Sequence, residues 1–376
     1  MSYIAFCDKI FVKEVNLYVF ILGEPAYTAS SWYKHILDGI LTEKRSKRFN
    51  LVILDSISET DNFQICDDDA LFLVGSDPKW LEYVIDASWQ KFSKNIIVLG
   101  NFERRLAGRN YSLVSSDISA DVRNIYAYLY SCGKTKIAMY GINPKSASDI
   151  YRKNSFLECG GNIEDIYENN ANLLQCYKNF ETYISKYDGI ICANDYSAIS
   201  LFRHSQSNTV TPPFIVSCGE TKLARLFNPS ITNLKTNYKD FGKAAINIYK
   251  TLQKDFSVSS VKVNLASDIF PGESTEKLPV LCQPSTLGTV STEEDDSFYT
   301  DNEISEMLCV ENILNHCDKT ELNMLFSLID GMTYADIAEK YHMSINGAKY
   351  RLHKLFELCH ANSKADFVEL VKKYLR

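Results

Sequence analysis

The most distinctive chemistry in the sequence is a basic run near its carboxyl end. Lys349, Arg351 and Lys354 supply three fixed positive charges within six residues, and no acidic residue interrupts them. Cations at this density form the kind of electrostatic footprint that attracts nucleic-acid phosphates. A short basic run can equally be the solvated face of a helix. Which interpretation holds depends on the secondary structure around the run.

Helix signals surround the basic run. Asp318 and Thr320 are N-cap candidates for a first helix, which ends at Asp330-Gly331, and Thr333 and Ser344 are N-cap candidates for two more. The apolar positions of the three predicted helices are Leu322, Leu325, Phe326, Leu328 and Ile329, then Tyr334, Ile337, Ala338 and Tyr341, then Ala348, Leu352, Leu355 and Cys359. The pattern predicts a helix-turn-helix in which the second helix of the pair begins at Ser344.

The helical turn of 100° per residue leaves a polar face on this last helix. A helix of this kind fits the DNA major groove, where we expect Lys349, Arg351 and Lys354 to neutralise phosphates. Asn346, Tyr350 and His353 are the candidates for base edges. The alternative is a helical bundle with another purpose, such as dimerisation. The candidate DNA-binding residues are Thr333, Ser344, Asn346, Lys349, Tyr350, Arg351, His353 and Lys354.

Residues 317–371 resemble the LuxR/GerE type of helix-turn-helix. The resemblance depends on Glu321, Leu325, the segment 330–338, Ser344, Lys349, Leu352 and Leu355. Where the family usually has Thr-Val before the lysine and His two residues after it, this sequence has Gly347-Ala348 and Arg351. The resemblance implies a double-stranded DNA partner, but the departures leave the DNA sequence that it reads open.

Residues 16–275 alternate short β-branched or aromatic runs with segments of helical period, as in a parallel sheet covered by helices. The predicted strands are Leu17–Leu22, Leu51–Leu54, Ala70–Val74, Asn95–Leu99, Lys136–Tyr140, Gly189–Cys192 and Phe214–Ser217.

From 277 to 310 the chain is acidic and rich in turn residues, which predicts a flexible linker between a first domain, 1–276, and a DNA-binding domain, 311–376.

The first domain resembles the sensor core of lac-repressor-family regulators and their periplasmic sugar-binding relatives. Pieces that match in the family's order are Val114–Asp117, Tyr128–Ala138, Tyr151–Phe156, Asp188–Ala198, Val216–Glu220, Pro229–Thr232, Gly242–Ala245 and Gly272–Thr275. The resemblance implies a bilobed α/β domain of the type I periplasmic-binding-protein kind, followed by a small all-α helix-turn-helix domain. It also implies a small-molecule effector, a sugar, in the cleft between the lobes.

By the same resemblance, Arg152, Asn194, Asp195 and Glu220 take positions that hydrogen-bond the ligand, and Asn101 is a weaker match on the first lobe. An Arg fork and carboxylates suit sugar hydroxyls, and Tyr27 and Trp32 could stack on the apolar face of a sugar. Each has a structural alternative: Arg152 in a surface ion pair, Asp195 as a helix cap, and Trp32 in the core.

The net charge of the chain, −7 over 376 residues, is unusual for a DNA-binding protein, but the charge is unevenly distributed. The segment Asp318–Arg376 holds nine Lys/Arg against eight Asp/Glu, a net charge of +1.

The sequence also lacks the features of membrane and secreted proteins. No membrane-spanning run or secretory leader is evident, and the 11 cysteines contain no CxxC pair, so we expect a cytoplasmic protein with reduced thiols, no metal and no cofactor.

Two other function classes were weighed. The mechanistic motifs of P-loop, dinucleotide-binding, serine-hydrolase and zinc-protease enzymes are absent, so we expect no enzyme. A response-regulator-like protein would use Asp55 as its phosphoacceptor, but a receiver domain of about 120 residues would leave most of the first domain unexplained. The preferred interpretation is a homodimeric regulator whose ligand closes the lobes and changes how the DNA-binding domains are presented.

Overall fold

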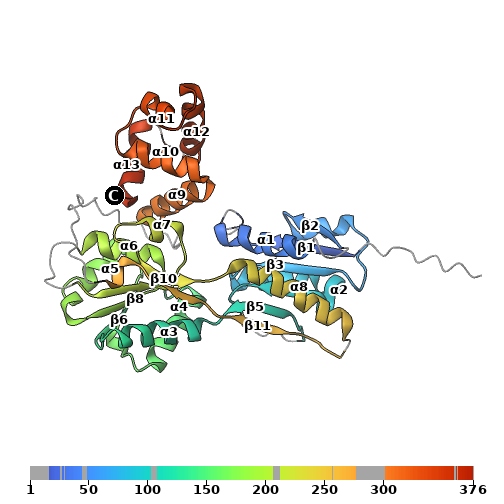
Figure 1. Ribbon diagram of the computed structural model, residues 1–376. Helices are drawn as coiled ribbons and strands as arrows, with labels where there is room; N and C mark the ends of the chain where they lie inside the picture. Colours follow the sequence, from blue (N-terminus) through green and yellow to red (C-terminus); the bar gives the residue numbers. More distant parts are fainter. Residues whose placement is uncertain are drawn as a thin grey trace, which may run out of the picture. The chain divides into compact units, whose positions relative to one another are not determined.

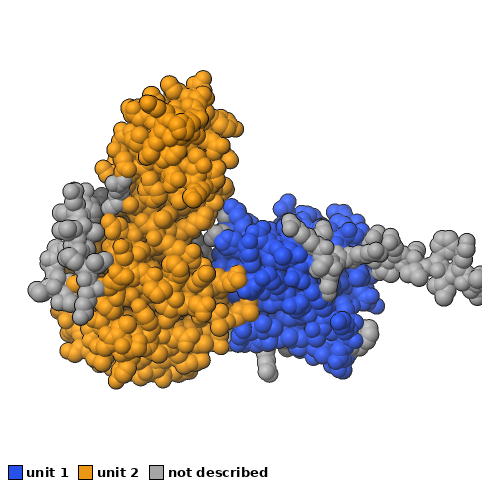
Figure 2. All heavy atoms as spheres, viewed as in Figure 1, with its two compact units in different colours: residues 1–115, 238–264 blue, residues 116–237, 265–376 orange. Residues whose placement is uncertain are grey.

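The structure, a computed structural model, describes residues 17–25, 28, 30–44, 49–102, 108–205, 212–255, 257–276, 301–359, 361 and 363–375. The chain divides into two compact units (Figure 2). Unit 1 contains the described residues up to Ser115 and Tyr238–Asn264; unit 2 contains Ser116–Asn237 and the described residues from Leu265 onward. No helix in the described ranges has the length and apolar character needed to cross a bilayer.

Unit 1 is built on a six-stranded sheet of order β11-β5-β4-β3-β1-β2. The neighbours β1–β2, β1–β3, β3–β4 and β4–β5 are parallel. Buried runs such as Ala70–Val74 fill its centre because a parallel sheet with helices on its faces has no solvated side. The elements are β1 (Tyr18–Gly23), α1 (Ser31–Lys44), β2 (Asn50–Leu54), β3 (Ala70–Val74), α2 (Pro78–Phe92), β4 (Ile96–Leu99), β5 (Ser112–Ser116), α8 (Tyr238–Lys254) and β11 (Lys262–Leu265) (Figure 1).

Unit 2 contains a second six-stranded sheet, of order β12-β10-β9-β8-β6-β7, in which only β12 runs antiparallel to its neighbour. Its elements are α3 (Ile118–Ser131), β6 (Ile137–Ile142), α4 (Ala147–Glu158), β7 (Ile166–Glu168), α5 (Leu173–Phe180), β8 (Gly189–Cys192), α6 (Asp195–His204), β9 (Phe214–Ser217), α7 (Lys222–Leu226), β10 (Thr232–Lys235) and β12 (Asp268–Phe270).

The two sheets share one topology. Across the sheet, the strand order β2-β1-β3-β4-β5 in unit 1 corresponds to β7-β6-β8-β9-β10 in unit 2, and each sheet gains one further edge strand, β11 or β12. This is the paired α/β arrangement expected of a type I periplasmic-binding-protein fold. All seven predicted strands are present. Strands β5, β7, β10, β11 and β12 were not predicted, because none of them contains an apolar run longer than two residues.

Five helices end the chain, and their contacts place them in unit 2. They are α9 (Asn302–His316), α10 (Lys319–Ile329), α11 (Tyr334–Lys340), α12 (Ile345–Glu357) and α13 (Lys364–Leu375). We call α10–α13 the helical module. Residues 302–310, which the sequence analysis assigned to the linker, form the first part of α9; the rest of the predicted linker, 277–300, lies outside the described residues. Ile304, Met307 and Val310 are buried at helical spacing, which the acidic composition obscured.

A close contact between α1 and α8 holds unit 1 together. A Cβ atom added to Gly242 of α8 would lie 2.3 Å from the Ile36 carbonyl oxygen, and one added to Gly39 of α1 would lie 2.0 Å from the Lys239 carbonyl oxygen. Both neighbours are backbone atoms, which move only if the helices separate. The two glycines therefore set the distance between α1 and α8.

We expect Gly242→Ala to destabilise the protein by about 1–3 kcal/mol, because overpacking outweighs the roughly 1 kcal/mol gained in helix propensity. Urea unfolding of the full chain measures the effect. Lys243→Ala on the same helix is the control and should change the unfolding free energy little, since its ion pair with Asp240 is largely solvated. A Gly242→Ala protein as stable as the control would contradict the packing argument.

Candidate functional site

Each helix of the predicted helix-turn-helix begins at the cap that the sequence indicates. Asp318 caps α10 and Thr333 caps α11, each in a capping box, with Glu321 and Asp336 as the reciprocal residues. Ser344 caps α12 by accepting the Gly347 amide at 3.0 Å. His342, at φ 53°, lies in the tight turn between α11 and α12. The local chemistry thus produces a helix pair joined by a short turn.

Helix α12 has one buried face and one exposed face. Ala348, Leu352, Leu355 and Phe356 pack into the apolar cluster of the module with Ile337 and Ala338 of α11. On the opposite side the Tyr350 side chain is 75% exposed. Asn346, Lys349, His353 and Lys354 are also exposed. The structure therefore brings five of the eight predicted DNA-binding residues to one accessible helix face.

The other three predicted DNA-binding residues have structural partners. The Arg351 guanidinium lies 3.2 Å from the Asp318 carboxylate and 3.8 Å from that of Glu321, so it ties α12 to the start of α10. The hydroxyl of Thr333 donates to Asp336 at 2.7 Å, and Ser344 is the cap already described. Thr333 and Ser344 are exposed, but their hydroxyls serve as caps, and Arg351 is half-buried against two carboxylates.

One residue of this surface was missed by the sequence reasoning. The Lys364 ammonium, at the start of α13, lies 4.4 Å from the centre of the Tyr334 ring, and the Lys349 ammonium lies 5.9 Å from the same ring. Two cations therefore flank one tyrosine beside α12. No local pattern could reveal this, because the three residues belong to three different helices.

In unit 2, Arg152 sits in a group of acids. Its guanidinium lies 2.5 Å from the Asp149 carboxylate, which is buried and also accepts the Asn143 amide at 3.0 Å. Asp121, which the sequence analysis did not select, is buried nearby. Burial raises the pKa of Asp121 to about 6, against the lowering effects of its bonds to Ser267 and of the Arg152 charge. The ion-pair alternative stated for Arg152 is thus present, with a buried partner rather than a surface one.

Asn194, Asp195 and Glu220 lie in the segments that follow β8 and β9. Asn194 caps α6 by accepting the Ser197 amide at 2.9 Å. Asp195 is 1% exposed; it accepts the Ser217 hydroxyl and, at 2.6 Å, the Thr221 amide, and burial raises its pKa. The helix cap is therefore Asn194 rather than Asp195. These bonds commit the Asp195 carboxylate to holding the segment after β9 in place.

Glu220 is half-buried and has two protein partners. Its carboxylate accepts the Thr236 amide at 2.6 Å and lies 2.6 Å from the Arg225 guanidinium. Burial raises its pKa, although both partners oppose that shift. Carboxyl ends of parallel strands are where α/β sheets place ligands, and Glu220 stays partly open there.

The predicted ligand residues of the first lobe have fewer described contacts than those of unit 2. Trp32 is half-buried in α1, and its ring centre lies 6.2 Å from that of Tyr238. Asn101 follows β4 and is half-exposed. Tyr27 lies outside the described residues. The ring contact packs Trp32 against α8, where its side chain stays half-buried.

A cleft of about 620 Å³ lies elsewhere in unit 2. Tyr126, Tyr167, Tyr183 and Tyr187 line it with Lys136 and Asp165, at the amino ends of β6, β7 and β8. None of the predicted ligand residues lines this cleft. Within the ranges that the structure describes, no group of three His, Cys, Asp or Glu side chains could hold a metal ion.

Comparison with known proteins places the fold. No protein-family model and no curated protein matches the sequence. Among solved structures, a transcription regulator from Lactobacillus plantarum has a TM-score of 0.54 at 18% identity over 70% of this chain and 100% of that chain. The LacI-family regulator CCPA from Weissella paramesenteroides with bound sucrose has a TM-score of 0.53 at 18% identity, again over 70% and 100%.

A further match is the transcriptional regulator CelR in complex with cellobiose, with a TM-score of 0.51 at 15% identity over 69% of this chain and 84% of that chain. At such identities the likeness concerns the fold. The chain therefore has the α/β core fold of LacI-family transcription regulators. The resemblance of its helical module to the LuxR/GerE type stays a prediction.

Proposed function

We propose that the protein is a DNA-binding transcription regulator that responds to a small molecule, a sugar. Its α/β core binds the effector, and its helical module binds double-stranded DNA through α12. The observation that carries the proposal is the division of α12, whose apolar face is buried while Asn346, Lys349, Tyr350, His353 and Lys354 remain exposed. A solvent-facing helix that follows a tight turn and presents cations and amide groups suits the major groove.

The DNA contacts divide into two kinds. In this proposal Lys349 and Lys354, with Lys364 beside them, supply phosphate contacts, and Asn346 and Tyr350 are the candidates for base edges. Arg351 acts mainly by holding α12 on α10, since it pairs with Asp318 and Glu321.

Two protomers reading two half-sites would supply the affinity that one small module lacks, so we include a homodimer in the proposal.

Support for a sugar effector comes from both the fold and the residues. Solved structures with this fold hold sucrose, glucose or cellobiose. In this chain Arg152, Asn194 and Glu220 offer a planar cation, an amide and a carboxylate that can orient sugar hydroxyls. Asp195 does not contact the effector in this proposal; its bonds to Ser217 and Thr221 fix the segment that carries Glu220.

A receiver-type regulator is the weaker candidate. Its domain has a single sheet, whereas this chain has two sheets with the same strand order. Asp55, the candidate phosphoacceptor, directly follows β2, the edge strand of its sheet. Nothing in the receiver interpretation accounts for the second sheet.

We expect the double substitution Lys349→Ala/Tyr350→Ala to lower affinity for a selected duplex by tenfold or more, as loss of a base contact costs about 1–3 kcal/mol. Gel shifts at several salt concentrations measure it, and the slope of log affinity against log salt should fall by about 1. The matched control is Lys254→Ala, an exposed lysine of α8. Unchanged DNA affinity in the double variant would refute the role of α12.

We expect Arg152→Ala to abolish the thermal stabilisation of the full chain by its sugar, which reaches about 2.7 kcal/mol at a hundredfold excess over Kd. Sucrose, glucose and cellobiose are the first sugars to screen. Because Arg152→Ala also removes the cation paired with buried Asp149, Arg152→Lys serves as a second variant that keeps the charge but not the fork. Lys153→Ala, whose lysine pairs with Glu168, is the control. Equal stabilisation in all four proteins would place the sugar elsewhere.

A further inference from the structure

One short loop of unit 2 is held from two sides. The β9–α7 loop, residues 218–221, leads from β9 to α7 and carries Glu220. From the sheet side, Asp195 accepts the Thr221 amide at 2.6 Å, and the neighbouring Ser217 hydroxyl also donates to it. From the other side the loop continues directly into α7, whose first amides are held by α9.

Glu311 of α9 makes that second attachment. Its carboxylate accepts the Leu223 amide at 2.7 Å and the Lys222 amide at 3.1 Å, the first two amides of α7. The Asn315 side chain donates to the same carboxylate at 2.9 Å, and Glu311 is only 6% exposed. Water therefore does not compete for these bonds, and a shift of the loop by an ångström would break them.

Two further carboxylates hold the same helix on the α/β part of unit 2. Glu303 lies 2.8 Å from the Arg203 guanidinium and accepts the Ser200 hydroxyl of α6 at 2.9 Å. Burial alone would raise its pKa, but His204 and Arg203 outweigh it and hold the pKa of Glu303 below its ordinary value. Asp301 accepts the Leu173 amide at the start of α5 at 2.8 Å. Helix α9 is thus anchored at three points.

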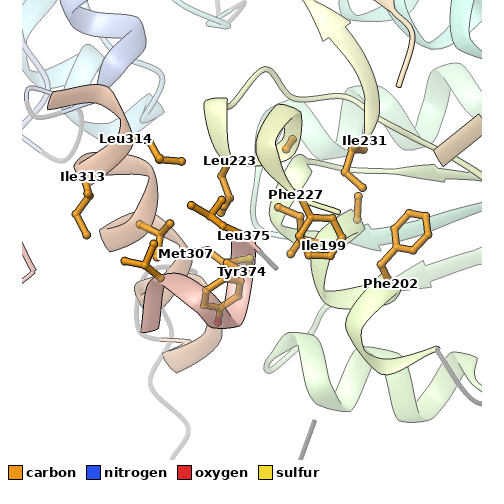
Figure 3. Packing of buried hydrophobic residues seen from close by; sticks show 14 of the residues in the cluster. Ile199, Phe202, Leu223, Phe227, Ile231, Met307, Ile313, Leu314, Tyr374 and Leu375 are labelled. Carbon is orange, nitrogen blue, oxygen red and sulfur yellow. The ribbon is translucent and has the colours of Figure 1, made fainter. Parts of the chain in front are cut away.

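The helical module is continuous with α9. Leu223 and Phe227 pack in one buried cluster with Met307 of α9 and with Tyr374 and Leu375 of α13 (Figure 3). The Tyr374 hydroxyl donates to Glu306 of α9 at 2.7 Å. The same cluster extends to Leu352 and Leu355 inside α12. A displacement of α9 must therefore move α12 or break a packed core.

We propose that Glu311 couples the β9–α7 loop to the helical module, so that the state of the effector residue Glu220 governs how α12 is presented to DNA. This inference rests on the proposed function and adds the route by which the effector acts. Helix α7 has only five residues, and its first two amides are bonded to Glu311. A displacement of the β9–α7 loop is therefore passed directly to α9. Glu311 is a positioning residue: it contacts neither effector nor DNA.

Coupling is reciprocal, which permits a test without a known effector. If the loop governs the module, DNA bound to the module must alter the loop. The experiment measures amide hydrogen exchange over 218–226 in the full chain, with and without a duplex enriched from a random-sequence library on that chain. We expect DNA to change exchange at Lys222 and Leu223 by about fivefold or more.

Glu311→Gln and Glu311→Ala should bind the same duplex with little change while exchange in 218–226 becomes independent of DNA. Glu311→Gln keeps one acceptor and so remains folded if Glu311→Ala does not. The charge-matched control is Glu158→Gln, an exposed glutamate of α4 in the same unit, away from the junction between α9 and the helical module. It should keep the DNA-dependent change.

The outcomes separate the two proposals. DNA binding with unaltered exchange in 218–226 of the unsubstituted chain overturns the coupling and leaves the proposed function standing. A DNA-dependent change that survives in both Glu311 variants, or disappears equally in Glu158→Gln, overturns the role of Glu311. Failure to enrich any duplex overturns DNA binding, and the coupling with it.

Discussion

Three carboxylates of α9 and its N-cap organise the helical end of unit 2; Glu311 is buried, and Asp301 and Glu303 are half-buried. Asp301, Glu303 and Glu311 of α9 satisfy backbone amides of α5 and α7 and pair with Arg203. A buried carboxylate is costly unless its oxygens are fully paired, so each one specifies where α9 lies as well as holding it there. Because α13 packs on α9, the helical module takes its position in unit 2 from these bonds.

Within the module, α12 has a packed inner face and an exposed outer face. Apolar residues of α10, α11 and α13 close over the inner face of α12, and Arg351 ties that helix to α10. What remains outward is a face with two lysines, a tyrosine, an asparagine and a histidine, beside Lys364. A rigid backing of this kind lets an exposed helix meet a ligand surface without losing much further entropy.

The predicted ligand residues show how far a sequence resemblance reaches. Arg152, Asn194, Asp195 and Glu220 all lie in unit 2, yet their roles there differ. Asp195 is committed to Ser217 and Thr221 and so acts as internal support, whereas Asn194 uses only its side-chain oxygen to cap α6. Asp121 joined the group only through folding, since it lies far from Arg152 and Ser267 in the chain and carries no local signal.

Periodicity and capping act over a few residues, so the sequence by itself determined the seven apolar strand cores, the caps of α10, α11 and α12, and the buried face of α12. Tertiary structure decided the rest: the extent of α9, the pairing of Arg351, the burial of Asp195 and the bond from Glu311 to Leu223, 88 residues apart. Such contacts depend on which surfaces folding brings together, and no pattern within one segment records that choice.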